Sequence, residues 1–209
     1  KNVNYASEAI KTAKILGCKK FINSGTFEET NIEYYLNNFF PKKHKQSQIN
    51  YSLAKLAVRD MCKMTAYLQK IDYIHTRLSI PLDPFLKKGS YVSKTLKKIY
   101  DGEIYDEPLN KQLFDIIFVN EVAEAYYLIG KYGKNKSDYF IGTGEPTTLK
   151  KYFKNFQRIV NKIKLEPYNM KEIEDKNYLK NFNTSLLHKD VGFIANSNIH
   201  ELLSNLECI

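Results

Sequence analysis

The sequence predicts an α/β protein built on a parallel sheet, and three observations lead to this fold class. Short apolar runs alternate with longer stretches of helical periodicity through residue 141. Two of these runs end in small or turn-forming residues: Asn23-Ser24-Gly25-Thr26 follows the first, and Pro81 and Pro84 follow the second. A segment of helical spacing lies between those two runs. The resulting order of strand, polar tip, helix and strand is typical of a parallel sheet.

The first predicted elements follow from the spacing of apolar side chains. Residues 4–16 carry them three or four apart, as an amphipathic helix does, and Gly17 provides a C-terminal stop. Residues 27–50 mix acidic, aromatic and basic side chains, which fits either a surface flap or a substrate-facing loop. The predicted order is a helix over 4–16, a strand over 19–23, this connection, a helix over 51–69 and a strand over 72–78.

The second half of the chain gives shorter signals. Gly102 ends one predicted helix, and a threonine after Pro146 is suited to cap another. In chain order, the sequence predicts a helix over 91–100, a strand over 114–119, a helix through Ala123–Leu128, a strand over 138–141, a helix over 149–162 and a terminal helix near 198–206.

The order of these elements suggests a domain organisation. No strand precedes the first helix in this sequence, so we expect the chain to begin in the middle of a fold. Residues 1–80 are predicted to be the C-terminal part of a sheet domain that includes the helix 51–69. Residues 81–209 are predicted to be a mixed region in which 112–142 returns to the sheet and the remainder forms a substrate-binding lobe.

Composition narrows the classes of function. No run approaches the roughly 20 apolar residues of a membrane span, and no basic-then-apolar leader is present, so we expect a cytoplasmic protein without a membrane partner. Cys18, Cys62 and Cys208 are too few and too widely spaced for a disulfide framework or a zinc knuckle. No metal site is predicted, because no spacing pairs the histidines as ligands; they are His44, His75, His188 and His200, expected to be surface or packed side chains.

The charge raises the question of a polyanionic partner. The net charge is +9 and the pI is near 9.2. Only Arg59, Arg77 and Arg158 among the 32 basic residues are arginine, the side chain that favours bidentate readout of phosphate and guanine. The lysines are spread along the chain rather than striped. Solvated lysine faces are therefore the expectation, nucleic acid is not the expected partner, and an anionic small ligand remains compatible with the charge.

One Tyr-x-x-x-Lys pair stands out by its context. Random placement of the tyrosines and lysines gives about two such pairs, and the chain has three, so the spacing alone predicts nothing. Only Tyr51 and Lys55 lie at the start of a predicted helix between two strand-like runs. Residues four apart share a helical face, and a cation beside a phenol favours phenolate and eases proton transfer. Thr26, at the carboxyl end of the first strand, is placed to hydrogen-bond the same substrate oxygen.

A family resemblance covers nearly the whole chain. Asn2–Asn4 with Gly17–Thr26 resembles the passage N-V-x-G-T … G-V-K-x-F-I-x-S-S-S of the extended short-chain dehydrogenase/reductases, in the NAD-dependent epimerase/dehydratase branch that acts on sugar nucleotides. Tyr51 follows Thr26 at the interval usual for that family. Later stretches are also similar: Arg77–Pro84 to R-x-x-N-x-Y-G-P, Phe114–Ala125 to R-D-F-I-Y-V-D-D-V-A-E-A, and Phe140–Leu149 to Y-N-I-G-T-G-E-P-T-S-L.

The resemblance implies a fold and a reaction. The fold would be the later half of a Rossmann-like parallel sheet with a small C-terminal substrate-binding region. The reaction would be epimerisation, dehydration or reduction of a nucleotide-linked sugar with NAD or NADP. Tyr51 would move a hydroxyl proton while hydride moves to or from the nicotinamide, and Lys55 would bind the nicotinamide ribose and tune Tyr51. Thr26 stands at the family's catalytic Ser or Thr position.

The resemblance also implies binding residues and an assembly. Ser24 and Pro81 stand where relatives line the nicotinamide pocket, together with Tyr51 and Lys55, and the substrate positions fall on Thr26, Phe27 and Ile80. Relatives commonly dimerise through the Tyr-bearing helix, so a homodimer is one expectation. Met61 and Met64 suit either such a face or the interior.

Several departures from the family pattern keep alternatives open. The Gly-rich pyrophosphate loop is not in this sequence, so most of the coenzyme site would lie outside these 209 residues. Ile80 replaces a common substrate-binding Asn, and Phe114 replaces a phosphate-binding Arg. Glu28 and Glu29 stand where dehydratases place acid–base carboxylates, although a solvated loop pair is the expectation. The alternatives are a truncated or degenerate relative without coenzyme binding and a basic module for RNA or another polyanion.

Overall fold

The computed structural model describes residues 2–38, 46–87, 89–109, 112–163 and 176–207. Within this part of the chain, no helix is long and apolar enough to cross a membrane. The helices are α1 (Asn2–Ile15), α2 (Glu28–Asn38), α3 (Gln46–Gln69), α4 (Tyr91–Tyr100), α5 (Val119–Tyr132), α6 (Leu149–Val160), α7 (Lys176–Leu179), the short 3₁₀ helix η2 (Lys180–Phe182), α8 (Ser185–Val191) and α9 (Ile199–Glu207). The strands are β1 (Lys20–Thr26), β2 (Asp72–Leu78), β3 (Ile80–Leu82), β4 (Leu113–Phe114), β5 (Ile116–Phe118), β6 (Asp138–Ile141) and β7 (Thr147–Thr148).

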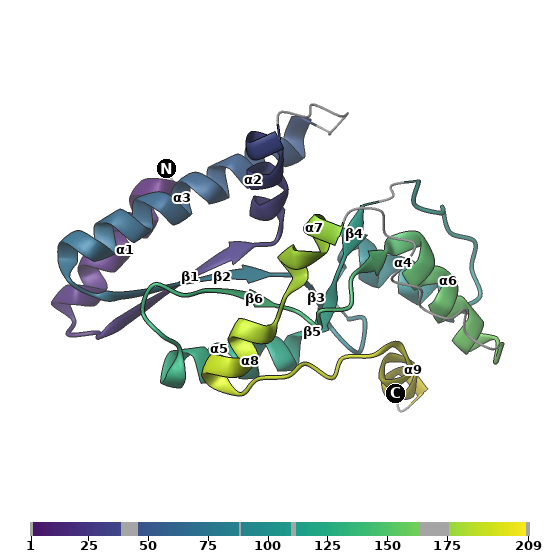
Figure 1. Cartoon of the computed structure of the whole chain (residues 1–209). Coiled ribbons are helices and arrows are strands. Elements are labelled where there is room, and N and C mark those ends of the chain that lie inside the picture. Colours follow the sequence, from purple (N-terminus) through teal and green to yellow (C-terminus); the bar gives the residue numbers. More distant parts are fainter. Residues whose placement is uncertain (1, 39–45, 88, 110–111, 164–175, 208–209) are drawn as a thin grey trace. The chain divides into compact units, whose positions relative to one another are not determined.

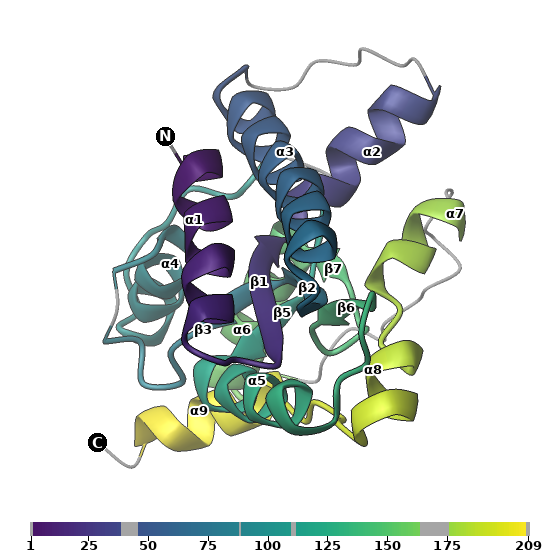
Figure 2. The same cartoon turned by 90° about the vertical axis from the view of Figure 1, so that its left-hand side faces the viewer.

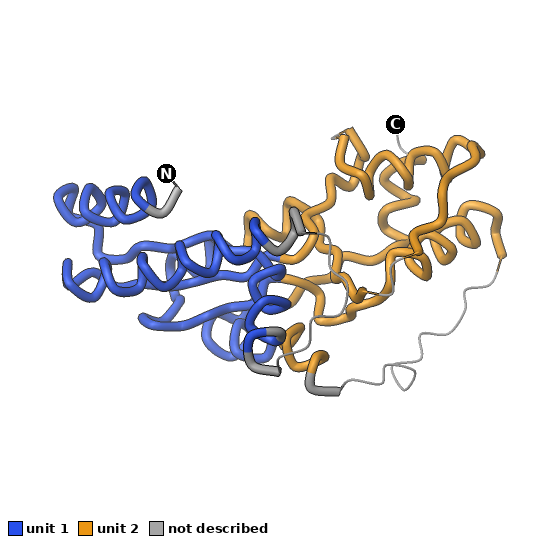
Figure 3. Tube along the Cα trace, turned by 90° about the horizontal axis from the view of Figure 1, so that it is seen from above, with its two compact units in different colours: residues 1–78, 125–141, 184–193 blue, residues 79–124, 142–183, 194–209 orange. Residues whose placement is uncertain are grey.

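The chain divides into two compact units, which Figure 3 draws in blue and orange. Unit 1 comprises residues 1–78, 125–141 and 184–193, and unit 2 comprises residues 79–124, 142–183 and 194–209. Each unit therefore collects segments that are far apart in the sequence. Helix α5 begins in unit 2 and continues in unit 1.

Unit 1 contains a parallel three-stranded sheet in the order β1-β2-β6, which confirms the predicted fold class. Helices α1 and α3 cover one face of this sheet, and α5 and α8 lie on the other (Figure 1). Figure 2 shows α1 and α3 side by side, and α3 also contacts β1 and β2. Because all three strands are parallel, their carboxyl ends meet at one edge of the sheet. That edge includes Thr26 and Leu78, which are register partners.

The core of unit 1 forms where α1 and α3 pack on the sheet. Ile10 of α1, Val58 and Cys62 of α3, and Tyr73 of β2 are all buried in one cluster. Burial of large apolar side chains of this kind stabilises a fold by about 1.5–3 kcal/mol each. The Cys62 thiol is free and its pKa is raised by that burial, so this side chain acts as a small hydrophobic residue.

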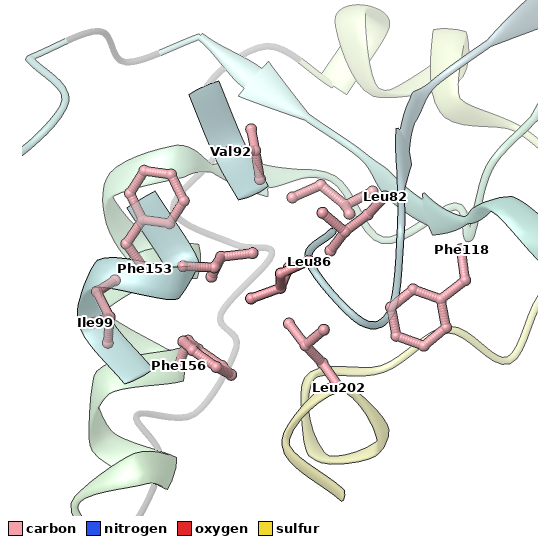
Figure 4. Packing of buried hydrophobic residues seen from close by; sticks show 10 residues of the cluster. Leu82, Leu86, Val92, Ile99, Phe118, Phe153, Phe156 and Leu202 are labelled. Carbon is pink, nitrogen blue, oxygen red and sulfur yellow. The ribbon is translucent and has the colours of Figure 1, made fainter. Parts of the chain in front are cut away.

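In the described residues, unit 2 is built from two small sheets, helices α4, α6, α7 and α9, the short helix η2 and the start of α5. Strand β3 pairs with β5 in parallel, and β4 pairs with β7 antiparallel. The packed side chains between the strands and helices include Leu82, Leu86, Val92, Leu96, Ile99, Phe118, Phe153, Phe156 and Leu202 (Figure 4). Thr148 Oγ1 accepts from Lys151 N and caps α6 as expected, and Ser90 Oγ accepts from Ser93 N and caps α4, which was not predicted.

The predicted connection over residues 27–50 is wrong. Helix α2 begins at Glu28, directly after β1, and α3 begins at Gln46 rather than at Tyr51. The apolar spacing missed both segments because their residues are largely polar. Residues 39–45, which include His44 and the basic run of that connection, lie outside the described residues, as does Cys208.

The strands of the segment 112–142 do not all join one sheet. Within the segment 112–142, β6 joins the parallel sheet of unit 1, whereas β5 pairs with β3 in unit 2. Helix α8 is a further element that the apolar pattern did not predict. Its Asp190 carboxylate accepts from the buried Tyr139 hydroxyl at 2.9 Å, which anchors the helix beside β6.

Candidate active site

The candidate site lies at the carboxyl end of β1, and the alternation of the strand decides which side chain faces which helix layer. Asn23 and Gly25 are buried on one face, and Ser24 between them is exposed on the other. Their register partners on β2 are His75 for Asn23 and Thr76 for Ser24. The tip of β1 is therefore contacted from both layers of helices.

Helix α3 reaches this tip through Lys55. The Lys55 ammonium donates a hydrogen bond to the backbone oxygen of Ser24 at 3.0 Å. An ammonium carries three hydrogens, so this bond leaves two donors available to a ligand. The contact sets the rotation of α3 relative to the strand. It places the predicted Lys at the edge of the sheet where ligands of parallel α/β proteins bind.

Tyr51 lies one turn before Lys55 on α3. Residues four apart occupy the same helical face, so Tyr51 and Lys55 are presented on one side of the helix. The Tyr51 side chain is 52% exposed, which leaves its phenol accessible to a ligand. Tyr51 is in the second turn of α3, and the helix that precedes it fixes its backbone more firmly than a helix start would.

On the opposite face, three hydroxyl groups form a chain. The Tyr126 hydroxyl lies 2.7 Å from Ser24 Oγ and 2.9 Å from Thr76 Oγ1, and Thr76 Oγ1 donates to the Asn23 backbone oxygen at 3.3 Å. Each hydroxyl has one hydrogen. Since Thr76 uses its own on Asn23, Tyr126 must donate to Thr76, and Ser24 must donate to Tyr126. Ser24 Oγ is left as an acceptor at the exposed tip of the strand.

Thr26 ends β1 and starts α2. Its backbone N–H donates to Glu29 Oε1 at 2.9 Å, and its Oγ1 accepts from Glu28 N at 3.4 Å. This reciprocal pair of bonds resembles a capping box at the start of α2, but Thr26 lies two residues before the first helical residue, Glu28, and its Oγ1 accepts from the N–H two residues on rather than three. The sequence carried the signal for it, a threonine followed three residues later by a glutamate, and the helix prediction did not use it.

The second oxygen of Glu29 binds a buried histidine. Glu29 Oε2 lies 2.7 Å from His75 Nε2, and Asn23 Nδ2 lies 3.1 Å from His75 Nδ1. Glu29 is 0% exposed, so the expectation of a solvated glutamate pair is wrong for this residue. The bond to Thr26 N and the register partner His75 pull the carboxylate into the protein. Glu28 remains partly exposed and accepts from Asn31 Nδ2 at 3.1 Å.

Gly25 makes this packing possible. A Cβ atom at this position would lie 2.4 Å from His75 Cε1 and 2.5 Å from Glu29 Oε1. Only glycine leaves room for the imidazole and the carboxylate to approach the strand so closely. The Ser-Gly-Thr tip of β1 thus follows from the buried pair beneath it.

The remaining predicted site residues are placed as follows. Phe27 is buried, donates its backbone N–H to Leu78 O at 3.0 Å, and packs edge-to-face on Phe140 with ring centroids 5.8 Å apart. Ile80 and Pro81 lie on β3 of unit 2 and are half-buried and exposed, respectively. Their predicted roles in substrate and nicotinamide binding stay predictions.

Unit 2 contains a second buried carboxylate, at Asp115. Asp115 accepts from Thr143 N at 3.0 Å, from Thr143 Oγ1 at 2.8 Å and from Gly144 N at 2.7 Å. Burial raises the pKa of this carboxyl, and the three hydrogen bonds oppose that rise. The Gly-Thr-Gly turn therefore holds a structural carboxylate. No group of three or more metal-ligating side chains occurs in the part of the chain that the structure describes.

The donor set at the tip of β1 is suited to a ligand rich in hydroxyl groups. Lys55 offers ammonium hydrogens, Tyr51 offers an accessible phenol, and Ser24 offers an accepting oxygen. A ribose or a pyranose ring presents hydroxyl groups that both donate and accept, so these residues fit the ribose side of a nicotinamide coenzyme or a sugar. A phenol is also a group that can transfer a proton.

Comparison with known proteins gives a family match over most of the chain. The sequence model described as the NAD dependent epimerase/dehydratase family matches residues 1–142. The CDP-abequose synthase of Salmonella muenchen is 25% identical over 173 residues, which cover 79% of this chain and 58% of that protein. The chain therefore spans less than two thirds of the length of this relative.

Solved structures show the same fold. The Bordetella bronchiseptica enzyme WbmF in complex with NADH aligns with a TM-score of 0.68 at 17% identity, covering 97% of this chain and 62% of that one. The UDP-glucose 4-epimerase of Thermotoga maritima with UDP-glucose aligns with a TM-score of 0.65 at 18% identity, covering 95% of this chain and 65% of that one. At these identities the likeness concerns the fold alone.

Proposed function

Because the chain belongs to the NAD dependent epimerase/dehydratase family, we propose that it is the catalytic part of a cytoplasmic enzyme that acts on a nucleotide-linked sugar. The reaction is an epimerisation, dehydration or reduction in which proton transfer by Tyr51 accompanies hydride transfer with NAD or NADP. The names of the relatives support this substrate class, since they include a CDP-sugar synthase and an enzyme in complex with UDP-glucose.

One observation carries the proposal. The hydrogen bond from Lys55 Nζ to Ser24 O holds the Tyr51-bearing face of α3 against the carboxyl end of β1. The lysines of the other two Tyr-x-x-x-Lys pairs are placed differently: Lys131 lies over the rings of Tyr127 and Tyr132, and Lys136 precedes the amino end of β6, not the carboxyl end of a strand. The structural context therefore separates Tyr51 and Lys55 from pairs of equal spacing.

Each residue at the tip has a role that its contacts support. Lys55 binds ribose hydroxyls with the two hydrogens that Ser24 O does not use. Tyr51, which lies one turn away on the same face of α3, takes the proton from a sugar hydroxyl and returns it. Thr26 donates its hydroxyl hydrogen to the same sugar oxygen, because its Oγ1 already accepts from Glu28 N. Ser24 Oγ accepts a hydrogen from the coenzyme side.

The coenzyme would supply one thing that this chain lacks, a ring that takes and returns hydride. Lys55, Tyr51 and Ser24 are the residues that would hold it at the tip of β1. A carbon cannot release hydride from an alcohol unless the hydroxyl proton leaves as well. Tyr51 therefore governs whether the sugar carbon can be oxidised at all.

The exposed apolar face of α3 supports a homodimer as the assembly. Met61, Met64 and Leu68 of α3 are more than half exposed, and so is Tyr5 on the neighbouring α1. Large apolar side chains gathered on adjacent helices are typical of a face that is covered in the working protein.

Replacement of Tyr51 by phenylalanine tests the catalytic assignment. In the natural gene product, Tyr51→Phe removes only the hydroxyl group, and we expect kcat to fall at least about a hundredfold, the usual contribution of a general acid–base group. The dissociation constant of the coenzyme should change little, because Lys55 and Ser24 remain. Turnover of candidate nucleotide sugars and coenzyme titration by fluorescence provide the two measurements.

Tyr67→Phe is the matched control, since Tyr67 lies on the same helix and is 73% exposed. It should leave kcat unchanged. If Tyr51→Phe also keeps its turnover, the proposed role of Tyr51 is wrong.

A further inference from the structure

The buried network beneath Thr26 consists of three side chains from three elements. Asn23 comes from β1, Glu29 from α2 and His75 from β2. Glu29 and His75 are almost completely inaccessible, with side-chain exposures of 0% and 3%. A buried carboxylate without partners is costly, so the position of Glu29 demands the hydrogen bonds that it makes.

The donors in this network can be assigned from its chemistry. Asn23 Nδ2 is a donor, so His75 Nδ1 accepts and the ring hydrogen lies on Nε2. His75 Nε2–H then donates to Glu29 Oε2, and the Thr26 backbone N–H donates to Glu29 Oε1. Both carboxylate oxygens are thereby used, one on the histidine and one on the candidate catalytic threonine. In the other neutral tautomer the hydrogen would lie on His75 Nδ1, and it would face the Asn23 Nδ2 donor.

We infer that Glu29 is a positioning residue, which fixes the backbone of Thr26 at the carboxyl end of β1 and is itself held in place by the buried His75–Asn23 pair. This inference rests on the proposed function of Thr26. An interaction of the capping-box type alone explains the bond to Thr26 N, but it requires neither the burial of Glu29 nor its second bond. Gly25 supports this inference, because any side chain at that position would overlap His75 and Glu29.

A fixed backbone at Thr26 also fixes the direction of its hydroxyl group. Its Oγ1 accepts from Glu28 N at the start of α2, so its own hydrogen points away from the helix. If Thr26 N were released from Glu29, the turn between β1 and α2 would loosen and the hydroxyl would lose its fixed direction. A displacement of such a group by a few tenths of an ångström raises the free-energy barrier of the chemical step more than it weakens substrate binding.

Two substitutions at Glu29 separate positioning from simple helix stability. Glu29→Ala removes both hydrogen bonds, and we expect kcat to fall about tenfold or more while KM changes by less than about threefold. Glu29→Gln keeps an acceptor for Thr26 N and offers a donor to His75, so it should retain kcat within about threefold. The glutamine also forces His75 into the Nδ1–H tautomer, with the Asn23 amide turned over, and nitrogen-15 spectra of the imidazole would report that exchange.

The matched control lies on the same helix. Glu33 accepts from Arg59 Nη1 at 2.5 Å and makes no contact with the tip of β1 in the described residues. Glu33→Gln weakens the attachment of α2 and should leave kcat within about twofold. Equal losses of kcat in Glu33→Gln and Glu29→Ala would mean that only helix stability matters, which would overturn the inference.

The native protein gives a further readout that does not depend on any variant or on activity. Amide hydrogen exchange at Thr26 should be strongly protected, and an unprotected Thr26 amide would refute the inference even if Glu29→Ala failed to fold. Tyr51→Phe, measured in parallel, distinguishes a failure of the positioning role of Glu29 from a failure of the proposed function. If Tyr51→Phe is inactive and Glu29→Ala is fully active, only the positioning role of Glu29 is wrong. If Tyr51→Phe is active, the proposed function itself is wrong.

Discussion

Lys55 donates its ammonium hydrogen to the backbone oxygen of Ser24 at 3.0 Å, and this bond joins the helix that carries Tyr51 to the tip of the first strand. The two residues are 31 positions apart, and the bond crosses the interval that contains α2 and the start of α3. A lysine held by a strand carbonyl is pre-organised for a ligand, since part of its conformational entropy is already lost.

Lys55→Met is expected to impair the chemical step. Methionine keeps an unbranched side chain of similar length but has neither charge nor donors, so Ser24 O loses its partner and the tip of β1 loses the ammonium group. We expect kcat to fall at least about a hundredfold and the coenzyme KM to rise, because the proposed roles of Lys55 are in both proton transfer and ribose binding. Steady-state kinetics on the natural gene product measure both parameters.

Lys63→Met gives the comparison for Lys55→Met, because Lys63 is exposed two turns later on the same helix. It should keep the kinetics of the parent protein. A Lys55→Met variant with the same kinetics as Lys63→Met would show that the Lys55–Ser24 contact has no part in turnover.

Tyr126→Phe is expected to weaken the hydroxyl chain at Ser24. Ser24 Oγ and Thr76 Oγ1 both lose a partner, whereas Thr76 still donates to Asn23 O. We expect the free energy of unfolding to fall by about 1 kcal/mol, the net contribution of a typical internal hydrogen bond, and the coenzyme KM to rise as the Ser24 hydroxyl becomes free to rotate. Urea denaturation and kinetics test the two effects, and Tyr127→Phe, at an exposed neighbouring position, should change neither.

Gly25→Ala is expected to disrupt the buried pair. The new methyl group would overlap His75 and Glu29 at distances of 2.4 and 2.5 Å, and overpacking of this kind costs about 1–3 kcal/mol or more. Gly130→Ala on α5 is the control, because nothing lies within 4 Å of its added Cβ, and alanine in a helix is favoured over glycine by about 0.5–1 kcal/mol. Denaturant midpoints should therefore move in opposite directions, and a stable Gly25→Ala would contradict the tight packing.

Much of unit 1 could be predicted from the sequence because its elements are encoded locally. The apolar run before Asn23 and the run before Arg77 gave β1 and β2, and the spacing after Tyr51 gave helix α3. That spacing did not give the buried side of α3, because Met61 and Met64 are exposed and the core is formed by Val58, Cys62 and Ala66. Tyr51, Lys55 and Thr26 followed from the order of those elements. The contact of Lys55 with β1 agrees with that order.

The buried network could not be predicted in the same way. Asn23 meets His75 only because β1 and β2 pair in one particular register, and no spacing along the chain reveals that register. Tyr126 reaches Ser24 from a helix that is 102 positions away. Helix α2 was missed for a different reason: the Thr26–Glu29 capping signal was present, but its residues are too polar to give an apolar stripe.

Asp190 provides a test of stability against pH. It accepts from Lys134 Nζ at 2.5 Å and from the Tyr139 hydroxyl at 2.9 Å, and the hydrogen bond from Lys134 lowers the pKa of its carboxyl below the ordinary value of 3.8. A carboxyl whose pKa is lower in the folded protein stabilises that state above the unfolded pKa. This contribution is lost as pH falls below 3.8 and through the folded pKa.

Asp190→Asn should therefore be less stable than the parent protein at neutral pH, and the difference should shrink as pH falls below 3.8. Urea midpoints measured between about pH 6 and pH 2.5 follow this narrowing. The difference in stability between Lys134→Met and the parent protein should shrink in the same way, since this substitution removes the group that lowers the pKa of Asp190. A gap between parent and Asp190→Asn that stays constant across this range would mean that the Lys134 bond does not lower the pKa in solution, and that Asp190 holds α8 against β6 through Tyr139 alone.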